Sequence, residues 1–168
     1  MAGDAHDRMN GDHDSRTCEE IARLIGQVSK MSWDLVTPFK EFQAGKIDAA
    51  VLRQRTAEPE VAILRDCLRA YELATEIEDA GTREKAVNLA AAVLQRQQGF
   101  SMMIEGIAIG DESRIARGGK LFEEGRNQAI ASVLAFTGSD SPHAAQLKRL
   151  LDAYDPHEDQ HDSRTRPN

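Results

Sequence analysis

With 168 residues, of which 40% are hydrophobic and only 5% aromatic, the chain is long enough for one domain with a hydrophobic core. Its formal net charge is −7 and no basic face is visible, so we expect no nucleic-acid partner. No stretch approaches the roughly 18 apolar residues of a membrane-spanning helix, so we expect no membrane insertion. Good helix formers dominate and period-two runs of β-formers are absent. This composition predicts an all-α protein.

Residues 1–15 are polar and acidic and show no apolar periodicity. We therefore expect this N-terminal segment to be disordered. It also lacks the basic start and the apolar run of a signal peptide. This favours a cytoplasmic protein, with secretion without a cleaved signal peptide as the alternative.

From about Arg16 to Gln43, apolar residues alternate spacings of three and four, which is typical of a helix that packs in a bundle. The residues on this face are Cys18, Ile21, Ile25, Val28, Ser32, Leu35, Phe39 and Phe42. The pattern continues past Pro38, so we expect a kink there rather than an end. Gly45 should terminate this helix, and Asp48 should cap the next one.

A second helix is expected from about Ala49 to Asp79. Pro59 either kinks it or begins a new helix at the first-turn position, where proline is tolerated. The apolar face that should enter the core is formed by Val61, Leu64, Leu68, Tyr71 and Ile77. We expect a turn at residues 80–82, with Gly81 closing one helix and Thr82 capping the next.

Two further helices, 83–109 and 112–136, each carry two ladders of residues at seven-residue spacing. The apolar ladder consists of Ala86, Val93, Phe100 and Ile107, and then Ile115, Phe122, Ala129 and Phe136. The small-residue ladder, our predicted packing seam, consists of Ala92, Gly99, Gly106, Gly118, Gly125 and Ser132. Because the chain reverses near residues 110–112, with Asp111 as a cap, the two helices should be antiparallel. Phe100 should then lie beside Phe122, and Gly99 beside Gly125.

Glycine costs about 1 kcal/mol against alanine inside a helix, so the small-residue ladder requires a compensating interaction. Close approach of the two helix backbones is one explanation, and a groove filled by a ligand or a partner helix is the other. With four helices joined by short turns, residues 16–137 should form an antiparallel four-helix up-down bundle.

A short amphipathic helix is predicted from Pro142 to Tyr154, within a linker and helix segment that covers residues 138–154. Its apolar face is formed by Ala144, Leu147, Leu151 and Tyr154. This fifth helix either docks on the bundle or anchors in a groove of another protein. Residues 155–168 should form a disordered tail. Trp33 lies off the main apolar face of the first helix, so it marks either an interface or a second packed face.

A polar layer interrupts the third and fourth helices at one height. Its candidate residues are Gln97, Gln98, Glu123, Arg126 and Asn127. Three interpretations stay open: side chains that point to solvent, a buried layer that fixes the register of the helices, or a site for a small polar ligand. A buried layer requires paired groups, because an unpaired buried amide costs about 1–3 kcal/mol.

Residues typical of catalysis are poorly placed in this chain. The histidines, which a di-iron bundle site would need on its inner helices, all lie in the tails or the last helix: His6, His13, His143, His157 and His161. Zinc-ligand spacing, phosphate-binding loops and nucleophile elbows are absent from the sequence. We expect no enzyme, no cofactor and no metal. Cys18 and Cys67 should be buried free thiols.

Residues 154–158 read Tyr-Asp-Pro-His-Glu. This is similar to the Tyr-x-x-x-Asp/Glu export signal of bacterial type VII secretion substrates, which are helical hairpins without a signal peptide. The Trp-x-Gly turn of that family is missing, since Trp33 is followed by Asp and Leu. The resemblance implies a secreted helical substrate.

The sequence favours a non-catalytic helical interaction or scaffold protein that binds a protein partner or self-associates. The interaction residues would be Trp33, Leu147, Leu151 and Tyr154. The alternatives are a small-ligand- or metal-binding bundle centred on the polar layer, and the secreted type VII-like substrate.

Overall fold

The protein is described by a computed structural model, which covers the backbone of residues 3–137 and the side chains of residues 13–135. It contains helices α1 (Gly3–Gln43), α2 (Ala49–Glu76), α3 (Ala80–Ile109) and α4 (Glu112–Thr137). These residues form no strand, so over this range the predicted all-α class is confirmed. The predicted fifth helix at 142–154 and the tail at 155–168 lie outside the described residues.

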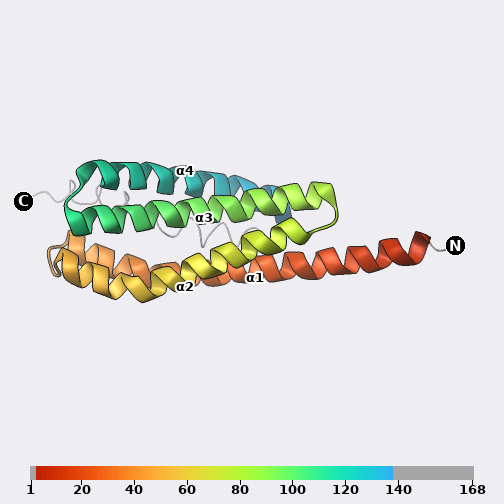
Figure 1. The fold of residues 1–168 in the computed structure, drawn as a ribbon, viewed down its shortest axis with the longest axis horizontal. Helices are drawn as coiled ribbons and strands as arrows, with labels where there is room; N and C mark the ends of the chain where they lie inside the picture. Colours follow the sequence, from red (N-terminus) through yellow and green to blue (C-terminus); the bar gives the residue numbers. More distant parts are fainter. Residues whose placement is uncertain (1–2, 138–168) are drawn as a thin grey trace, which may run out of the picture.

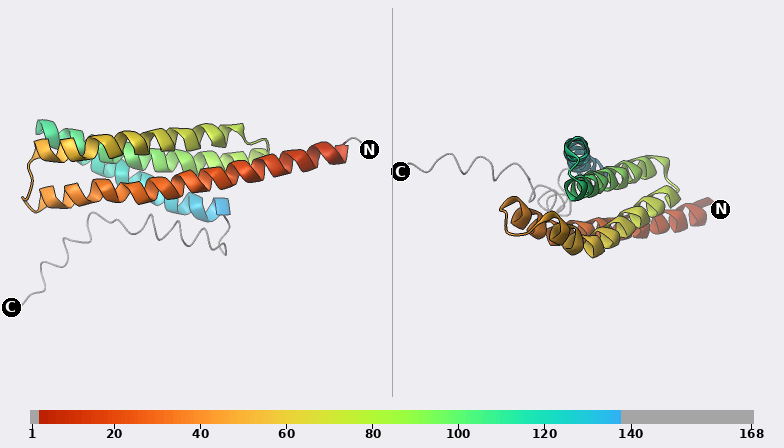
Figure 2. Two further views of the ribbon diagram at one scale, coloured as in Figure 1. Left: turned by 90° about the horizontal axis from the view of Figure 1, so that it is seen from below. Right: turned by 60° about the vertical axis from the view of Figure 1, so that its left-hand side comes forward.

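The four helices form two antiparallel hairpins, α1–α2 and α3–α4, that lie against each other (Figures 1 and 2). α2 packs on both α1 and α3, and α3 packs along α4. α1 approaches α3 only at a few points, and among the described helices α4 packs on α3 alone. The arrangement is a helical bundle in which α1 and α4 flank α3 without close approach of their backbones.

Within residues 3–137, none of the helices carries a stretch both long and apolar enough to cross a lipid bilayer.

Two of the three turns follow the predicted chemistry. Gly45 adopts a left-handed φ of 68° after α1, and the Asp48 side chain accepts a hydrogen bond of 2.9 Å from the Val51 N–H. Gly110 adopts a φ of 69° after α3, and the Asp111 side chain accepts from the Arg114 N–H at 3.0 Å. Local sequence was sufficient here because a cap needs only neighbouring residues.

The α2–α3 turn differs from the prediction. α2 ends at Glu76, and α3 begins at Ala80 with Asp79 as its N-cap, whose side chain accepts from the Thr82 N–H at 2.7 Å. Gly81 and Thr82 therefore lie within the first turn of α3 rather than in the connection. Asp and Thr are both good N-caps, so the local sequence offered two positions for the start of this helix.

The N-terminal segment also differs, since α1 begins at Gly3 whereas residues 1–15 were predicted to be disordered. Asp14 supplies one reason: its carboxylate accepts hydrogen bonds of 2.9 Å from the backbone N–H groups of Asp79 and Glu78. These bonds hold the pKa of Asp14 below its usual value. A contact 64 residues away in the sequence cannot be inferred from local periodicity. Beyond it, α1 extends past the α2–α3 turn (Figure 1).

Both prolines lie inside continuous helices, Pro38 in α1 and Pro59 in α2. For Pro59 the alternative of a new helix is therefore excluded. Each proline removes one backbone N–H from its helix, and α2 visibly changes direction in its orange-to-yellow part (Figure 1).

The helices α3 and α4 approach so closely that a side chain at several glycines would meet backbone. A Cβ on Gly99 would lie 2.3 Å from the Phe122 nitrogen, and one on Gly125 would lie 2.4 Å from the Arg96 nitrogen. Each glycine thus faces the backbone of the other helix rather than the opposite glycine, so Gly99 does not lie directly beside Gly125. Phe100 and Phe122 do meet, with ring centroids 6.2 Å apart.

Most of the predicted core face of α2 does not enter the core, although Ile77 is buried as predicted. Val61, Leu68 and Tyr71 are 69%, 51% and 37% exposed. The buried face consists instead of Leu52, Thr56, Glu60, Ile63, Cys67, Ala70, Leu73, Ala74 and Ile77. α2 lies between α1 and α3, and small side chains such as Ala70 and Ala74 allow both neighbours to approach. The larger apolar side chains of Val61, Leu68 and Tyr71 therefore point toward solvent.

Candidate functional site

The predicted polar layer is divided between core and solvent. Gln97 is 3% exposed and Arg126 is half-buried, whereas Gln98, Glu123 and Asn127 are exposed. Arg96, beside Gln97, is also buried at 4% exposure. The inward part of the layer is therefore small and lies mainly on α3.

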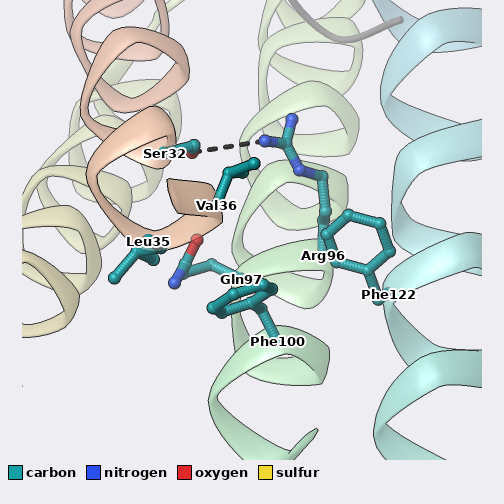
Figure 3. Close-up of a pocket in the computed structure, with 7 residues that line it drawn as sticks. All are labelled: Ser32, Leu35, Val36, Arg96, Gln97, Phe100 and Phe122. Carbon is teal, nitrogen blue, oxygen red and sulfur yellow. Dashed lines mark hydrogen bonds between the residues drawn. The ribbon is translucent and has the colours of Figure 1, made fainter. Parts of the chain in front are cut away.

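Arg96 links three helices. Its Nη2 donates a hydrogen bond of 3.2 Å to the Ser32 Oγ of α1, and its guanidinium lies 5.7 Å from the ring centroid of Phe122 of α4 (Figure 3). The Ser32 hydroxyl donates in turn to the Val28 carbonyl at 2.8 Å. A cation over an aromatic face contributes more when it is shielded from water. Arg96 thus ties α1 and α4 to α3 at one level.

A small cavity lies beside Arg96, with a volume of about 10 Å3. Its walls are formed by Ser32, Leu35, Val36, Arg96, Gln97, Phe100 and Phe122 (Figure 3). A cavity of this size holds about one water molecule. The Gln97 Nε2 is buried without a hydrogen-bond partner among the described residues, and such a water would satisfy it. A metabolite would fit only if α1 moved away from α4.

The described part of the chain contains no cluster of three His, Cys, Asp or Glu side chains that could hold a metal ion. Cys18 and Cys67 are both free thiols, and Cys67 is buried as predicted, whereas Cys18 is only half-buried and not fully buried as predicted.

We expect Cys67 to react with iodoacetamide at pH 8 at least about 100-fold more slowly than Cys18. Burial raises the pKa of Cys67 to about 12, so only about one thiol in 10⁴ is ionised at pH 8, and the surrounding core blocks the reagent. Burial also raises the pKa of Cys18, but its half-buried side chain stays accessible. Mass spectrometry of native protein over time gives both rates. In denaturant the rates should converge, and similar rates in native protein would contradict the burial of Cys67.

The outer face of α2, defined by Val61, Leu64, Leu68 and Tyr71, is the largest feature that the sequence interpretation assigned wrongly. Its residues keep the three-and-four spacing of a packing face, yet Val61, Leu64 and Leu68 line a shallow surface hollow. Charged residues of both signs border this hollow, namely Arg65, Asp66, Arg69 and Glu72. The sequence signal was present, because α2 carries two apolar ladders and only one can face the core.

Trp33, a predicted interaction residue, is 43% exposed on α1. Leu147, Leu151 and Tyr154, the others, lie outside the described residues. Ile109 is also exposed, at 67%, but it stands alone at the α3–α4 turn.

Comparison with known proteins gives no match: no family model fits the chain, and neither the curated proteins nor the solved structures contain a significant relative.

Proposed function

We propose that this chain is a non-catalytic helical interaction protein, and that its binding surface is the outer face of α2. The observation that carries this proposal is the exposure of Val61, Leu68 and Tyr71 at helical packing intervals. Isolated apolar residues are common on protein surfaces, but a contiguous stripe rimmed by charge is typical of a binding site. A partner helix with its own apolar stripe fits such a face.

A second copy of the chain is the partner that we propose first. In a two-fold dimer, if one residue of the first copy contacts another residue of the second copy, the same contact occurs with the copies exchanged. An antiparallel pair of α2 helices would therefore place Val61 beside Tyr71 and Leu64 beside Leu68. The rim of the hollow has two cationic and two anionic side chains. This surface is therefore locally neutral, although the whole chain has a formal net charge of −7. Fully burying a side chain such as leucine contributes about 1.5–3 kcal/mol before the cost of association.

We expect light scattering to give a dimer mass for the wild-type chain and a monomer mass for Val61→Glu with Leu68→Glu. Both positions are more than half exposed, so each change should alter the free energy of unfolding by no more than about 0.5 kcal/mol. Ile109→Glu is the control, because it introduces a glutamate at an apolar residue that is 67% exposed but lies outside the outer face of α2. A dimer that persists in the double variant would place the interface elsewhere, and a wild-type monomer would contradict self-association.

The cytoplasm is the location that we assign to this interaction protein. Export by a type VII-like route is the second candidate, favoured only by the Tyr-Asp-Pro-His-Glu sequence at 154–158. Deleting residues 154–168 would then retain the protein inside the cell. The short C-terminal helix predicted at 142–154 also belongs to this proposal.

A further inference from the structure

The connection between α2 and α3, residues 77–79, is where the chain passes from the first hairpin to the second. It lies at the right-hand end of the bundle, and α1 runs past it (Figure 1). Ile77 is extended, with φ −63° and ψ 129°. The backbone groups of such a connection lie outside the hydrogen bonds of either helix, so they need other partners.

Two side chains, one from each hairpin, supply these partners. The Oδ1 of Asp14 on α1 accepts a hydrogen bond of 2.9 Å from the Glu78 N–H, and its Oδ2 accepts one of 2.9 Å from the Asp79 N–H. Arg83 on α3 donates from Nη1 to the carbonyl oxygens of Ile77 and Glu78, at 3.0 and 3.4 Å. The connection is therefore held from α1 on one side and from α3 on the other.

The position of Asp14 on α1 brings its carboxylate to this connection. It precedes Thr17 and Ile21 by three and seven residues, so the three residues share one face of the helix. Thr17 and Ile21 are 7% and 0% exposed. Asp14 thus lies where the buried face of α1 reaches the connection. Each carboxylate oxygen accepts one bond, and a protonated carboxyl would carry a hydrogen on one of these two oxygens.

The ionised form of Asp14 is the one that its surroundings favour. The N–H groups of Asp79 and then Glu78 hold the pKa of Asp14 below its ordinary value of 3.8, and His13 on α1 acts in the same direction. Burial and the Asp79 carboxylate oppose this shift. Hydrogen bonds to an ionised acceptor are stronger than bonds between neutral groups. Protonation would therefore weaken both bonds from the connection.

Asp79, which caps α3, responds to pH in the same direction. The N–H and the side chain of Thr82 hold the pKa of Asp79 below 3.8, and Lys85 on α3 adds to this. A carboxylate whose pKa is lower in the folded chain than in the unfolded chain stabilises the fold above the unfolded pKa. That stabilisation is lost as the pH falls through the folded pKa. Both carboxylates of the connection therefore lose their contribution below about pH 3.8.

We propose that Asp14, Asp79 and Arg83 form an acid-labile clasp that fixes the connection between the two hairpins. Protonation of Asp14 releases the N-terminal part of α1 from residues 77–79 and lets the hairpins move about this connection. The clasp lies apart from the outer face of α2, so it does not depend on the interaction proposed above.

Hydrogen exchange on the full-length chain at pH 7 tests the clasp. Asp14→Asn removes the charge and one acceptor oxygen, and Asp14→Ala removes both acceptors while favouring the helix. Each change should accelerate exchange at least about tenfold at residues 77–79 and 13–21, and leave residues 99–125 of α3 and α4 unchanged. Asp34→Asn is the matched control, because it removes the same charge from an exposed position of α1. Its exchange should be that of the wild type.

An acid titration followed by NMR gives the second readout. The amide resonances of Glu78 and Asp79 should shift with a midpoint below pH 3.8 in the wild type, and the part of this shift that Asp14 causes should be absent in Asp14→Asn. Wild-type exchange at both segments in both Asp14 variants would overturn the clasp. So would equal acceleration in residues 99–125, which would show a global loss of stability, or amide resonances that titrate identically in wild type and Asp14→Asn.

Discussion

Gly99→Ala and Gly125→Ala should each lower the free energy of unfolding by about 3 kcal/mol, which corresponds to a fall in Tm of roughly 6–12 °C for a chain of this size. A single methyl group at either position would meet a backbone nitrogen of the other helix at 2.3 or 2.4 Å. A backbone nitrogen cannot rotate away as a side chain can. The helices α3 and α4 must therefore separate along their shared face, and the loss exceeds the roughly 1 kcal/mol that alanine gains in helix propensity.

Two other glycines provide the controls for this prediction. A Cβ on Gly119 would meet only the Met103 Sδ, at an ordinary 3.7 Å, and one on Gly26 would meet nothing within 4 Å. Gly119→Ala and Gly26→Ala should therefore raise the free energy of unfolding by up to about 1 kcal/mol. Urea unfolding of all four variants gives the comparison. If Gly125→Ala proved as stable as Gly119→Ala, the close approach of α3 and α4 would be wrong.

Ile63→Ala should lower the free energy of unfolding by about 2–5 kcal/mol, whereas Leu68→Ala should lower it by less than about 1 kcal/mol. Ile63 is fully buried and Leu68 is 51% exposed, although both are large aliphatic residues of α2. Truncation at Ile63 leaves a cavity between tightly packed helices, while at Leu68 water fills the space and alanine favours the helix.

The free energies of unfolding of these variants should be measured on dilute protein. Dimer formation through the outer face of α2 would otherwise stabilise the folded chain by mass action. Leu52→Ala, at a position of 0% exposure, should behave like Ile63→Ala. A larger loss at Leu68 than at Ile63 would restore the face that periodicity alone predicted.

Arg96 and Gln97 show how far the polar layer could be predicted. The sequence located a polar interruption in α3 and α4, but seven-residue spacing could not say which side chains enter the core. Arg96 enters because it has partners on both sides, Ser32 on α1 and the Phe122 ring on α4. Gln98, Glu123 and Asn127 have equally polar side chains, but they lie on the outer sides of their helices.

The sequence by itself determined the all-α class, the caps at Asp48 and Asp111, and the pairing of Phe100 with Phe122. The helical class and the caps depend on residues close together in the chain. The pairing of Phe100 with Phe122 depends on two helices that a short turn holds antiparallel. Only the tertiary structure decided which face of α2 is buried, because that depends on α1 and α3 approaching from both sides. It also decided the contact of the N-terminal part of α1 with the α2–α3 turn, whose backbone N–H groups donate to Asp14. Which face of a helix is buried depends on the helices that pack against it, and the apolar periodicity of one helix does not identify those neighbours.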